Sequence, residues 1–411
     1  MNESHFLSRC FHLHRTASGD EVKTLRVGTI GFDDGRFAAL TYLLYPYKVD
    51  LTRQVEHADL VVCKDEAPDS SKPIIRTRGG LRKRPELLDQ GNGIVDLRAD
   101  VIDSCSKTFE AAMNPSLALR YRIATRFPLS YHVIPSSMRE KLLRRRTGHS
   151  TLDLSRHLAV ETSRRIIGDA FTLLGFPLQR KNPPSLVITH DIESEKGLQK
   201  AAGLMKVEEK LELKSTWFLP SDEYCLNARL VRELAESSSI GSHDSKHDGR
   251  LIQIQKHSDL VQRLMSSRLR LESIIEKTVD RFRAPLLQFN RRIIKALGEA
   301  GYKMDFSAPT WEPVHPSTMS GFGVESVQAF EIDGVVEIPL SLTQDHQVIN
   351  VLGMTLREAT KFWIEEAKLV RSMSGDIVLL VHPDYSFSQH LPEYRELLEN
   401  LIGVHTQFNR S

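Results

Sequence analysis

The sequence LVITHDIE, residues Leu186–Glu193, decides the fold of this 411-residue chain. Its apolar start, followed at once by polar residues, is typical of a buried strand that ends in a loop. Asp191 and Glu193 are two positions apart, so in an extended chain their side chains point to the same side. The stretch therefore predicts a buried strand that brings two carboxylates together at its end.

A pair of histidines further along the chain, His243 and His247, stands at helical spacing in the sequence GSHDSKHD. Two neutral imidazoles and one carboxylate form the ligand set of a catalytic zinc-type site, which keeps a coordination position for water. The second carboxylate is then available to move a proton, and this combination is typical of a hydrolase. Two other interpretations stay open. In one, the histidines are surface or core residues without a metal. In the other, the two acids are the N-cap and first-turn residues of the following helix.

Strand-like and helix-like segments alternate on both sides of these motifs. This alternation predicts βα units with parallel strands, either in a barrel or in a doubly wound sheet. Polar residues that follow the strands, such as Asp191, His243, Arg283 and His382, gather at one rim in a barrel. We expect strands at residues 186–190, 214–219, 239–243, 281–284, 335–340 and 376–382, and helices at 198–211, 227–236, 259–277, 291–300, 355–373 and 391–401.

A Pro-Pro sequence in residues 179–185 marks the clearest domain boundary, because proline cannot continue a helix and favours an extended connector. We predict a smaller α/β domain of unknown role at residues 1–180 and a catalytic barrel at residues 181–411. Strands are expected in the first domain at 25–31 and 58–63, followed by a helix at about 152–174.

The composition argues against several classes of protein. A formal net charge of +2 and basic clusters without interleaved aromatic residues disfavour binding to nucleic acid. Scattered cysteines without a CxxC pair disfavour a disulfide framework or a cysteine metal site.

No leader peptide or membrane-spanning run is visible, and we expect a cytoplasmic protein. The basic clusters are expected to be a solvated face, with contact to an anionic membrane surface or a lipid-linked substrate as the alternative; they comprise Arg76, Arg78, Arg82, Lys83 and Arg84, and Arg144–Arg146.

From about residue 185 to 402 the chain resembles the polysaccharide deacetylases, the NodB-like carbohydrate esterases of family 4. Five motifs stand in the order of that family, each near a predicted strand end. Two residues depart from the pattern, because Glu193 replaces the usual aspartate ligand and Asp248 replaces a proline after the second histidine. The five matching motifs are Thr189–Glu193, Gly241–His247, Arg283–Pro285, Gly301–Ser307 and Leu380–Pro383.

The resemblance implies a distorted (β/α) barrel, similar to a TIM barrel, and a hydrolase of carbohydrate metabolism. Its metal, most simply zinc, would be held by Glu193, His243 and His247. The substrate would be an N-acetylated sugar, and the activity would be that of a metal-dependent carbohydrate N-deacetylase. Asp191 would be the general base that takes a proton from the metal-activated water.

The resemblance also implies roles for residues around the metal. Arg283 would orient the base, and His382 would be the general acid that gives a proton to the leaving amine. Asp305 would pair with the far ring nitrogen of His382. The backbone N–H of Leu286 or Leu287 would stabilise the oxyanion, and Leu380 with Trp311 would form the recess for the acetyl methyl group.

Alternatives remain open for the function as well. The same scaffold can host hydrolysis of another non-peptide C–N bond, or a carbohydrate-binding relic without catalysis. Arg283 can also be a structural ion-pair partner, Asp305 a turn cap and His382 a satisfied buried histidine. The sequence GFDDG at Gly31–Gly35 resembles the commonest first motif of the family, but no histidine pair follows it at the needed distance. We interpret it as a chance match in a loop.

Overall fold

The computed structural model describes residues 24–66, 71–78, 87–97, 100–113, 153–312 and 323–408. The chain divides into two compact units. The first contains the described residues of Met1–Phe109 together with Ala159–Ser185, and the second contains those of Glu110–Leu158 and Leu186–Ser411. The domain limits expected from the sequence, 1–180 and 181–411, stay a prediction.

The first unit is built on a twisted, mainly parallel sheet with the strand order β2-β1-β3-β4-β6-β5. Only the β5–β6 pair among these strands is antiparallel. Its core includes the buried residues Val61, Cys63 and Ile74. The elements are β1 (Leu25–Ile30), α2 (Asp34–Leu44), β2 (Val49–Thr52), β3 (Leu60–Lys64), β4 (Ile74–Thr77), β5 (Leu87–Asp89), β6 (Ile94–Leu97) and α7 (Ala159–Leu173), with α3 (Val101–Met113) running across the boundary of the two units.

The GFDDG sequence belongs to this first unit and begins a helix. The carboxylate of Asp33 accepts a hydrogen bond from the N–H of Arg36 at 2.8 Å and so caps α2 at its N-terminus. The loop expected over Gly31–Gly35 therefore ends at Asp33, and the helix begins at Asp34. Of the basic clusters, Arg76 and Arg78 both lie near the carboxylate of Asp96, and the remaining residues, at 82–84 and 144–146, lie outside the described residues.

The second unit is an α/β barrel with the strand order β12-β13-β11-β10-β9-β8-β7-β14. Every pair in this order is parallel except β12–β13. The central strand β8 is buried at each of its positions, as expected for a parallel strand that is covered on both faces. The strands are β7 (Leu186–Asp191), β8 (Ser215–Leu219), β9 (Ser239–Ser242), β10 (Arg281–Phe282), β11 (Met304–Asp305), β12 (Phe330–Ile332), β13 (Val335–Glu337) and β14 (Ile377–Leu380).

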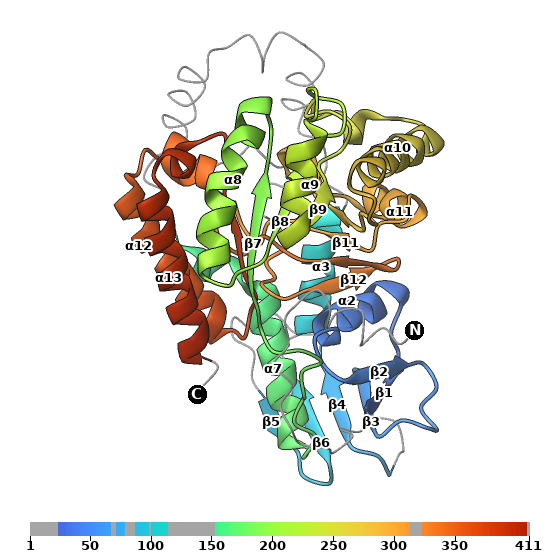
Figure 1. The fold of residues 1–411 in the computed structure, drawn as a ribbon. Helices are drawn as coiled ribbons and strands as arrows, with labels where there is room; N and C mark the ends of the chain where they lie inside the picture. The colour runs from blue at the N-terminus through green and yellow to red at the C-terminus, as the bar shows by residue number, and fades with distance from the viewer. Residues whose placement is uncertain are drawn as a thin grey trace. The chain divides into compact units, whose positions relative to one another are not determined.

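The helices of this unit lie around the outside of the sheet (Figure 1). Neighbours contact one another in the order α12, α13, α8, α9, α10 and α11, which follows the order of the strands. Side-chain caps begin several of them, including Ser194 for α8 and a Thr355–Glu358 capping box for α12. The helices are α8 (Glu195–Lys210), α9 (Ala228–Ser237), α10 (His257–Ile275), α11 (Arg291–Glu299), α12 (Leu356–Ser372) and α13 (Leu391–Phe408).

An irregular segment rather than a strand closes the barrel. After β13, Pro339 has no N–H to continue the ladder. Beyond it, the N–H of Leu342 donates to the carbonyl of Val378 in β14 at 3.2 Å. The hydroxyl of Ser341 donates to the carbonyl of Asp376 at 2.7 Å and accepts from the N–H of Val378 at 2.8 Å. This closure accounts for the distorted barrel, and it confirms the fold class expected from the sequence.

Among the described residues, none of the helices combines the length and the apolar composition that crossing a lipid bilayer requires. The carboxyl ends of β7, β9, β10 and β14 lie at the same rim of the barrel, because these strands are parallel. β9 and β10 are followed directly by His243 and Arg283, whereas β7 and β14 are followed by loops that carry Glu193 and His382. The candidate site is built from these loops.

Candidate active site

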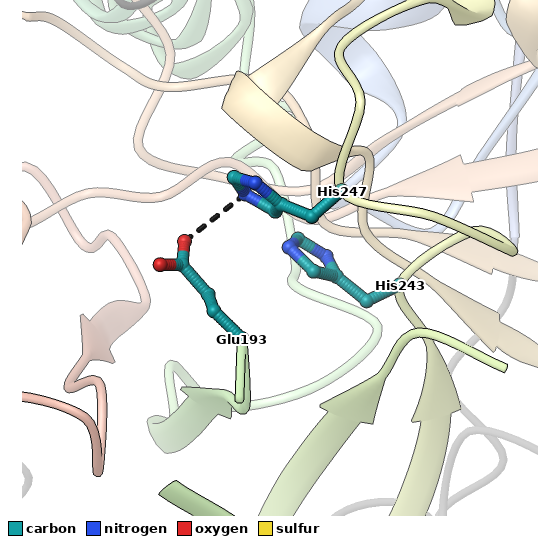
Figure 2. Close-up of side chains that lie close together, drawn as sticks. All are labelled: Glu193, His243 and His247. Atoms are coloured by element: carbon teal, nitrogen blue, oxygen red, sulfur yellow. Dashed lines mark ion pairs between the residues drawn. The ribbon is translucent and has the colours of Figure 1, made fainter. Parts of the chain in front are cut away.

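Three potential metal ligands lie together at the rim of the barrel. One ligand atom from each of Glu193, His243 and His247 lies within 4.8 Å of the other two (Figure 2). Glu193 follows β7 and both histidines follow β9, two parallel strands that flank β8 and end at the same rim. The structure therefore joins the carboxylate and the imidazoles that the sequence predicted as a set.

The two histidines lie in a loop rather than on a helix, although their spacing is helical. Asp244 directly after His243 has a φ of 64°, a left-handed conformation that stops a helix from forming there. The carboxylate of Asp244 is held by Arg263 at 2.9 Å and 2.6 Å, and Arg263 also pairs with Asp248. This buried arrangement, and not a helical turn, sets the distance between the imidazoles.

His243 is oriented as a metal ligand requires. Its Nδ1 lies 2.8 Å from the carbonyl oxygen of Arg283, so Nδ1 donates and Nε2 keeps its lone pair. Burial lowers the pKa of His243 to about 4, which makes the neutral imidazole the dominant form near pH 7. Its Nε2 is buried and has no hydrogen-bond partner among the described residues. A buried lone pair without a donor is expected where a cation binds.

His247 and Glu193 form a close pair at the mouth of the cluster. Nε2 of His247 lies 3.0 Å from Oε1 of Glu193. Burial alone would raise the pKa of Glu193, but His247 holds it well below its ordinary value. The second carboxylate oxygen of Glu193 accepts a hydrogen bond from the hydroxyl of Tyr385 at 3.1 Å.

Asp191 lies beside the cluster and is held by a buried arginine. Nη1 of Arg283 donates to Oδ1 of Asp191 at 3.0 Å and to the hydroxyl of Thr189 at 2.9 Å. The other oxygen, Oδ2, lies 3.9 Å from Nε2 of His243 and 4.0 Å from Nε2 of His382. Burial opposes ionisation of Asp191, but Arg283 and the two histidines keep its pKa below the ordinary value.

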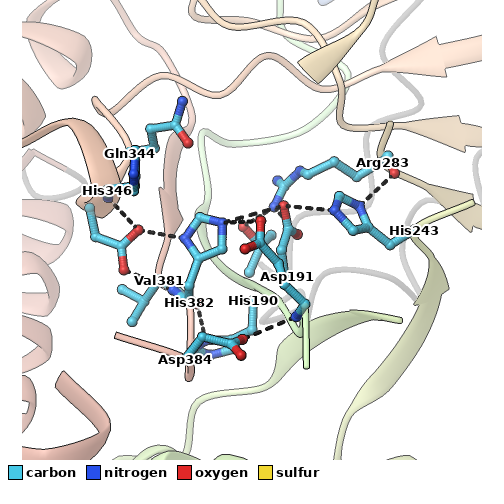
Figure 3. A network of polar contacts seen from close by, with 12 residues as sticks. His190, Asp191, His243, Arg283, Gln344, His346, Val381, His382 and Asp384 are labelled. Atoms are coloured by element: carbon cyan, nitrogen blue, oxygen red, sulfur yellow. Dashed lines mark hydrogen bonds and ion pairs between the residues drawn. The ribbon is translucent and has the colours of Figure 1, made fainter. Parts of the chain in front are cut away.

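His382 follows β14 and faces the same space from the other side (Figure 3). Its Nε2 lies 3.7 Å from Oε1 of Glu193. Its Nδ1 lies 2.6 Å from Oδ1 of Asp345, and its backbone N–H donates to Oδ2 of the same aspartate at 2.8 Å. Burial alone would lower the pKa of His382, but Asp345, with Glu193 and Asp191, raises it to about 10.

The expected pairing of Asp305 with His382 is therefore wrong, because Asp345 contacts Nδ1 instead. Asp305 lies directly opposite Glu337 in the register of β11 and β13. Burial raises the pKa of Asp305 to about 6 and that of Glu337 well above its ordinary value, so this pair retains a proton. The Asp305 carboxyl group therefore has a structural role between β11 and β13. Its Oδ1 accepts a hydrogen bond from the N–H of Ser307 at 3.2 Å.

Asp345 is a site residue that could not be predicted from the sequence motifs. It stands beside His346 in a connection between β13 and α12, away from every motif of the resemblance. The only local signal was an Asp-His dipeptide before a helical pattern. The connection forms a single π-helical segment at His346–Val351, and the Asp345 carboxylate accepts from the N–H of His346 at 2.8 Å.

The predicted substrate-contact residues fall in different places. Leu380 is buried at the end of β14. Leu286 has a left-handed φ of 58°, and the N–H of the following Leu287 already donates to the carbonyl of Ala284 at 3.0 Å. This leaves Leu286 as the candidate oxyanion donor of the two. The ring of Trp311 stacks on that of His157, with centroids 4.9 Å apart, and its place in an acetyl recess stays a prediction.

Residues 179–304 match the family model described as polysaccharide deacetylase. This segment is therefore similar to that family. It contains β7 to β10 and the three potential ligands, together with Asp191 and Arg283. His382 and Asp345 lie beyond the matched residues, so their place in the site follows from the geometry described above. None of the curated proteins matches the chain.

Several solved structures match about half of this chain, and three of them are as follows. A polysaccharide deacetylase-like protein of Mycobacterium smegmatis is 19% identical over 53% of this chain and 84% of its own, with a TM-score of 0.45. The chitin deacetylase of the fungus Colletotrichum lindemuthianum is 14% identical over 55% and 83%, with a TM-score of 0.38. A family 4 pseudoenzyme of Bacillus anthracis is 14% identical over 53% and 62%, with a TM-score of 0.36. At these values the likenesses carry no information about activity.

Proposed function

We propose that this protein is a metal-dependent hydrolase that removes the N-acetyl group from an amino sugar in a glycan or a glycan precursor. One observation carries the proposal. The carboxylate of Asp191 and the imidazole of His382 both lie beside the three potential ligands. Oδ2 of Asp191 is 3.9 Å from Nε2 of the ligand His243 and 4.0 Å from Nε2 of His382. Amide hydrolysis needs a base that takes a proton from the attacking water and an acid that gives a proton to the leaving nitrogen. The family of residues 179–304 supports a sugar as the substrate.

Glu193, His243 and His247 would hold the metal, and zinc suits a set of two nitrogens and one oxygen. The buried Nε2 of His243 supports this fit, because it has no hydrogen-bond partner among the described residues and His243 groups with Glu193 and His247 as potential ligands. When bound, such a metal supplies a Lewis acid that polarises a carbonyl oxygen and lowers the pKa of water.

Asp191 would accept the proton of the attacking water. Arg283 holds one oxygen of its carboxylate and leaves Oδ2 facing the cluster. Because its pKa stays below the ordinary value, Asp191 is ionised at neutral pH and can act as a base. Arg283 thus determines both the direction and the charge of this carboxylate.

His382 would give a proton to the leaving nitrogen. An amine is a poor leaving group, so the C–N bond breaks only when the nitrogen is protonated. Asp345 raises the pKa of His382, and its contact with Nδ1 directs the proton on Nε2 toward the cluster. The backbone N–H of Leu286 would stabilise the negative charge that develops on the carbonyl oxygen.

Acetate release from N-acetylglucosamine oligomers tests the proposal. Zinc-loaded protein is expected to release acetate, and both a chelator and Asp191→Asn are expected to abolish the release. His382→Gln should lower kcat, whereas His390→Gln, at an exposed histidine after the same strand, should not. Release that survives chelation and Asp191→Asn would exclude this site as the catalytic centre.

A panel of cyclic and linear amides separates the proposed activity from the other hydrolase on the same scaffold. Turnover of a cyclic amide without acetate release would assign the site to that other C–N bond. Zinc binding without turnover of any substrate would favour a binding protein instead.

A further inference from the structure

The two residues after the His382-Pro383 sequence both contact the potential ligand Glu193. A carboxylate oxygen of Asp384 accepts a hydrogen bond from the backbone N–H of Glu193 at 3.0 Å. The hydroxyl of Tyr385 donates to Oε2 of the Glu193 side chain at 3.1 Å. The loop after β14 therefore holds Glu193 at its backbone and at its carboxylate.

Asp384 also ties the same loop to the start of α8. Its second oxygen accepts a hydrogen bond from the hydroxyl of Ser194. That hydroxyl in turn accepts from the N–H of Gly197 at 3.1 Å, as the N-cap of the helix. A Cβ atom at position 197 would collide with the Asp384 carboxylate, so the glycine is needed for this close approach. Figure 3 shows Asp384 below His382, joined to the loop that follows Asp191.

The two carboxylate oxygens of Glu193 have different partners. Oε1 faces His247 at 3.0 Å and His382 at 3.7 Å, whereas Oε2 faces the phenol. Glutamate has one more rotatable bond than aspartate, and a fixed partner on one oxygen limits the rotamers that the side chain can adopt.

We propose that Asp384 and Tyr385 are positioning residues that fix Glu193 as a metal ligand, with Asp384 setting its backbone and Tyr385 its carboxylate. The inference rests on the proposed function in one respect, since it takes Glu193 as a ligand. It explains how the longer glutamate can take the place of the aspartate expected from the family motif.

Zinc affinity measured by competition with a chromophoric chelator tests the role of Tyr385 without reference to activity. Tyr385→Phe is expected to weaken zinc binding by about 10- to 100-fold, the usual effect of removing a partner of a metal ligand. Tyr302→Phe is the matched control, because the Tyr302 hydroxyl donates to the backbone carbonyl of Leu264 in α10 at 3.0 Å and not to a ligand or its peptide groups. It should leave zinc affinity within about twofold of wild type.

A double-mutant cycle separates positioning from a general structural effect. In Glu193→Asp the carboxylate is one methylene shorter and loses its contact with the phenol. Tyr385→Phe should therefore change zinc affinity by less than about twofold in that background. Equal effects of Tyr385→Phe in both backgrounds would overturn the role of Tyr385.

Two glycines of α8 provide the corresponding test for Asp384. Gly197→Ala should push the Asp384 carboxylate away and weaken zinc binding as Asp384→Asn does. Gly203→Ala adds a methyl group to the same helix with only ordinary contacts to Leu391, and it should leave zinc affinity unchanged. Unchanged affinity in both Gly197→Ala and Asp384→Asn would overturn the role of Asp384.

The outcomes distinguish this inference from the proposed function. Wild-type protein that binds no zinc would overturn both. Wild-type protein that binds zinc and releases acetate, with Tyr385→Phe and Asp384→Asn binding zinc equally well, would overturn only the positioning roles.

Discussion

Nδ1 of His382 lies 2.6 Å from Oδ1 of Asp345, an aspartate that stands 37 residues earlier in the chain. The same carboxylate accepts the backbone N–H of His382 at 2.8 Å, so it fixes the ring and its loop together. A buried imidazole held in this way keeps one ring orientation and so one direction for its second nitrogen. The proposed general acid therefore depends on a connection between β13 and α12.

Asp345→Asn is expected to lower kcat for acetate release on the order of 10²-fold, because the acid loses the charge that keeps it protonated. Asp305→Asn should lower kcat by less than about tenfold, because Asp305 pairs with Glu337 and not with His382. Steady-state kinetics on both variants check this ranking. A larger loss of kcat in Asp305→Asn would contradict the assignment of Asp345.

Arg283→Met should lower kcat/KM about 10²-fold, because Asp191 would lose the donor that orients it and the charge that keeps it ionised. Arg283→Lys keeps the charge without the planar fork and should recover only part of the loss. The comparison of kcat/KM for the two variants provides the test, with circular dichroism to verify folding. Equal activity of wild type and Arg283→Met would remove Arg283 from the site.

Zinc should raise the midpoint of thermal unfolding, because a metal that binds only the folded chain stabilises it by about 2.7 kcal/mol at 100 times Kd. His243→Ala should abolish this zinc-dependent rise. His257→Ala, at a half-exposed histidine paired with Glu299, should retain it. Differential scanning fluorimetry with and without chelator measures the effect, and a rise that persists in His243→Ala would place the metal elsewhere.

Glu366→Gln tests a buried carboxyl group outside the site. Burial raises the pKa of Glu366 to about 7, against opposing hydrogen bonds from the N–H and the hydroxyl of Thr343. The folded chain thus keeps this proton where the unfolded chain has lost it, and stability should fall as the pH rises from about 4.5 to 7. Glutamine mimics the protonated form, so Glu366→Gln should lack this loss of stability. The unfolding midpoint of the variant minus that of wild type should therefore increase as the pH rises over this interval. A constant difference from pH 5 to 8 would contradict the raised pKa.

Most of the barrel could be predicted from the sequence, because its βα units have local signatures. Buried apolar runs give β7, β8 and β14, and amphipathic periodicity with capping residues gives the helices. The two-residue strand β10 was predicted but made too long, and the short strands β11 and β12 were missed. Such strands are defined by their neighbours in the sheet and carry little periodicity of their own.

The candidate site was predictable where residues follow strands within a motif, as for Asp191, His243 and His382. Parallel strands bring such positions together at one rim. Asp345 was missed because its partner depends on how an irregular connection folds back on β14. The histidine spacing gave the right pair but suggested a helix, since the left-handed Asp244 depends on its contact with Arg263.

Anomalous diffraction at the zinc absorption edge, from crystals of the full chain grown with zinc, tests the central claim most directly. One strong peak is expected at about 2.0–2.2 Å from the Glu193 carboxylate and from ring nitrogens of His243 and His247. A peak held by other residues, or no peak while Glu193 remains paired with His247, would contradict the metal centre on which the proposed hydrolysis depends.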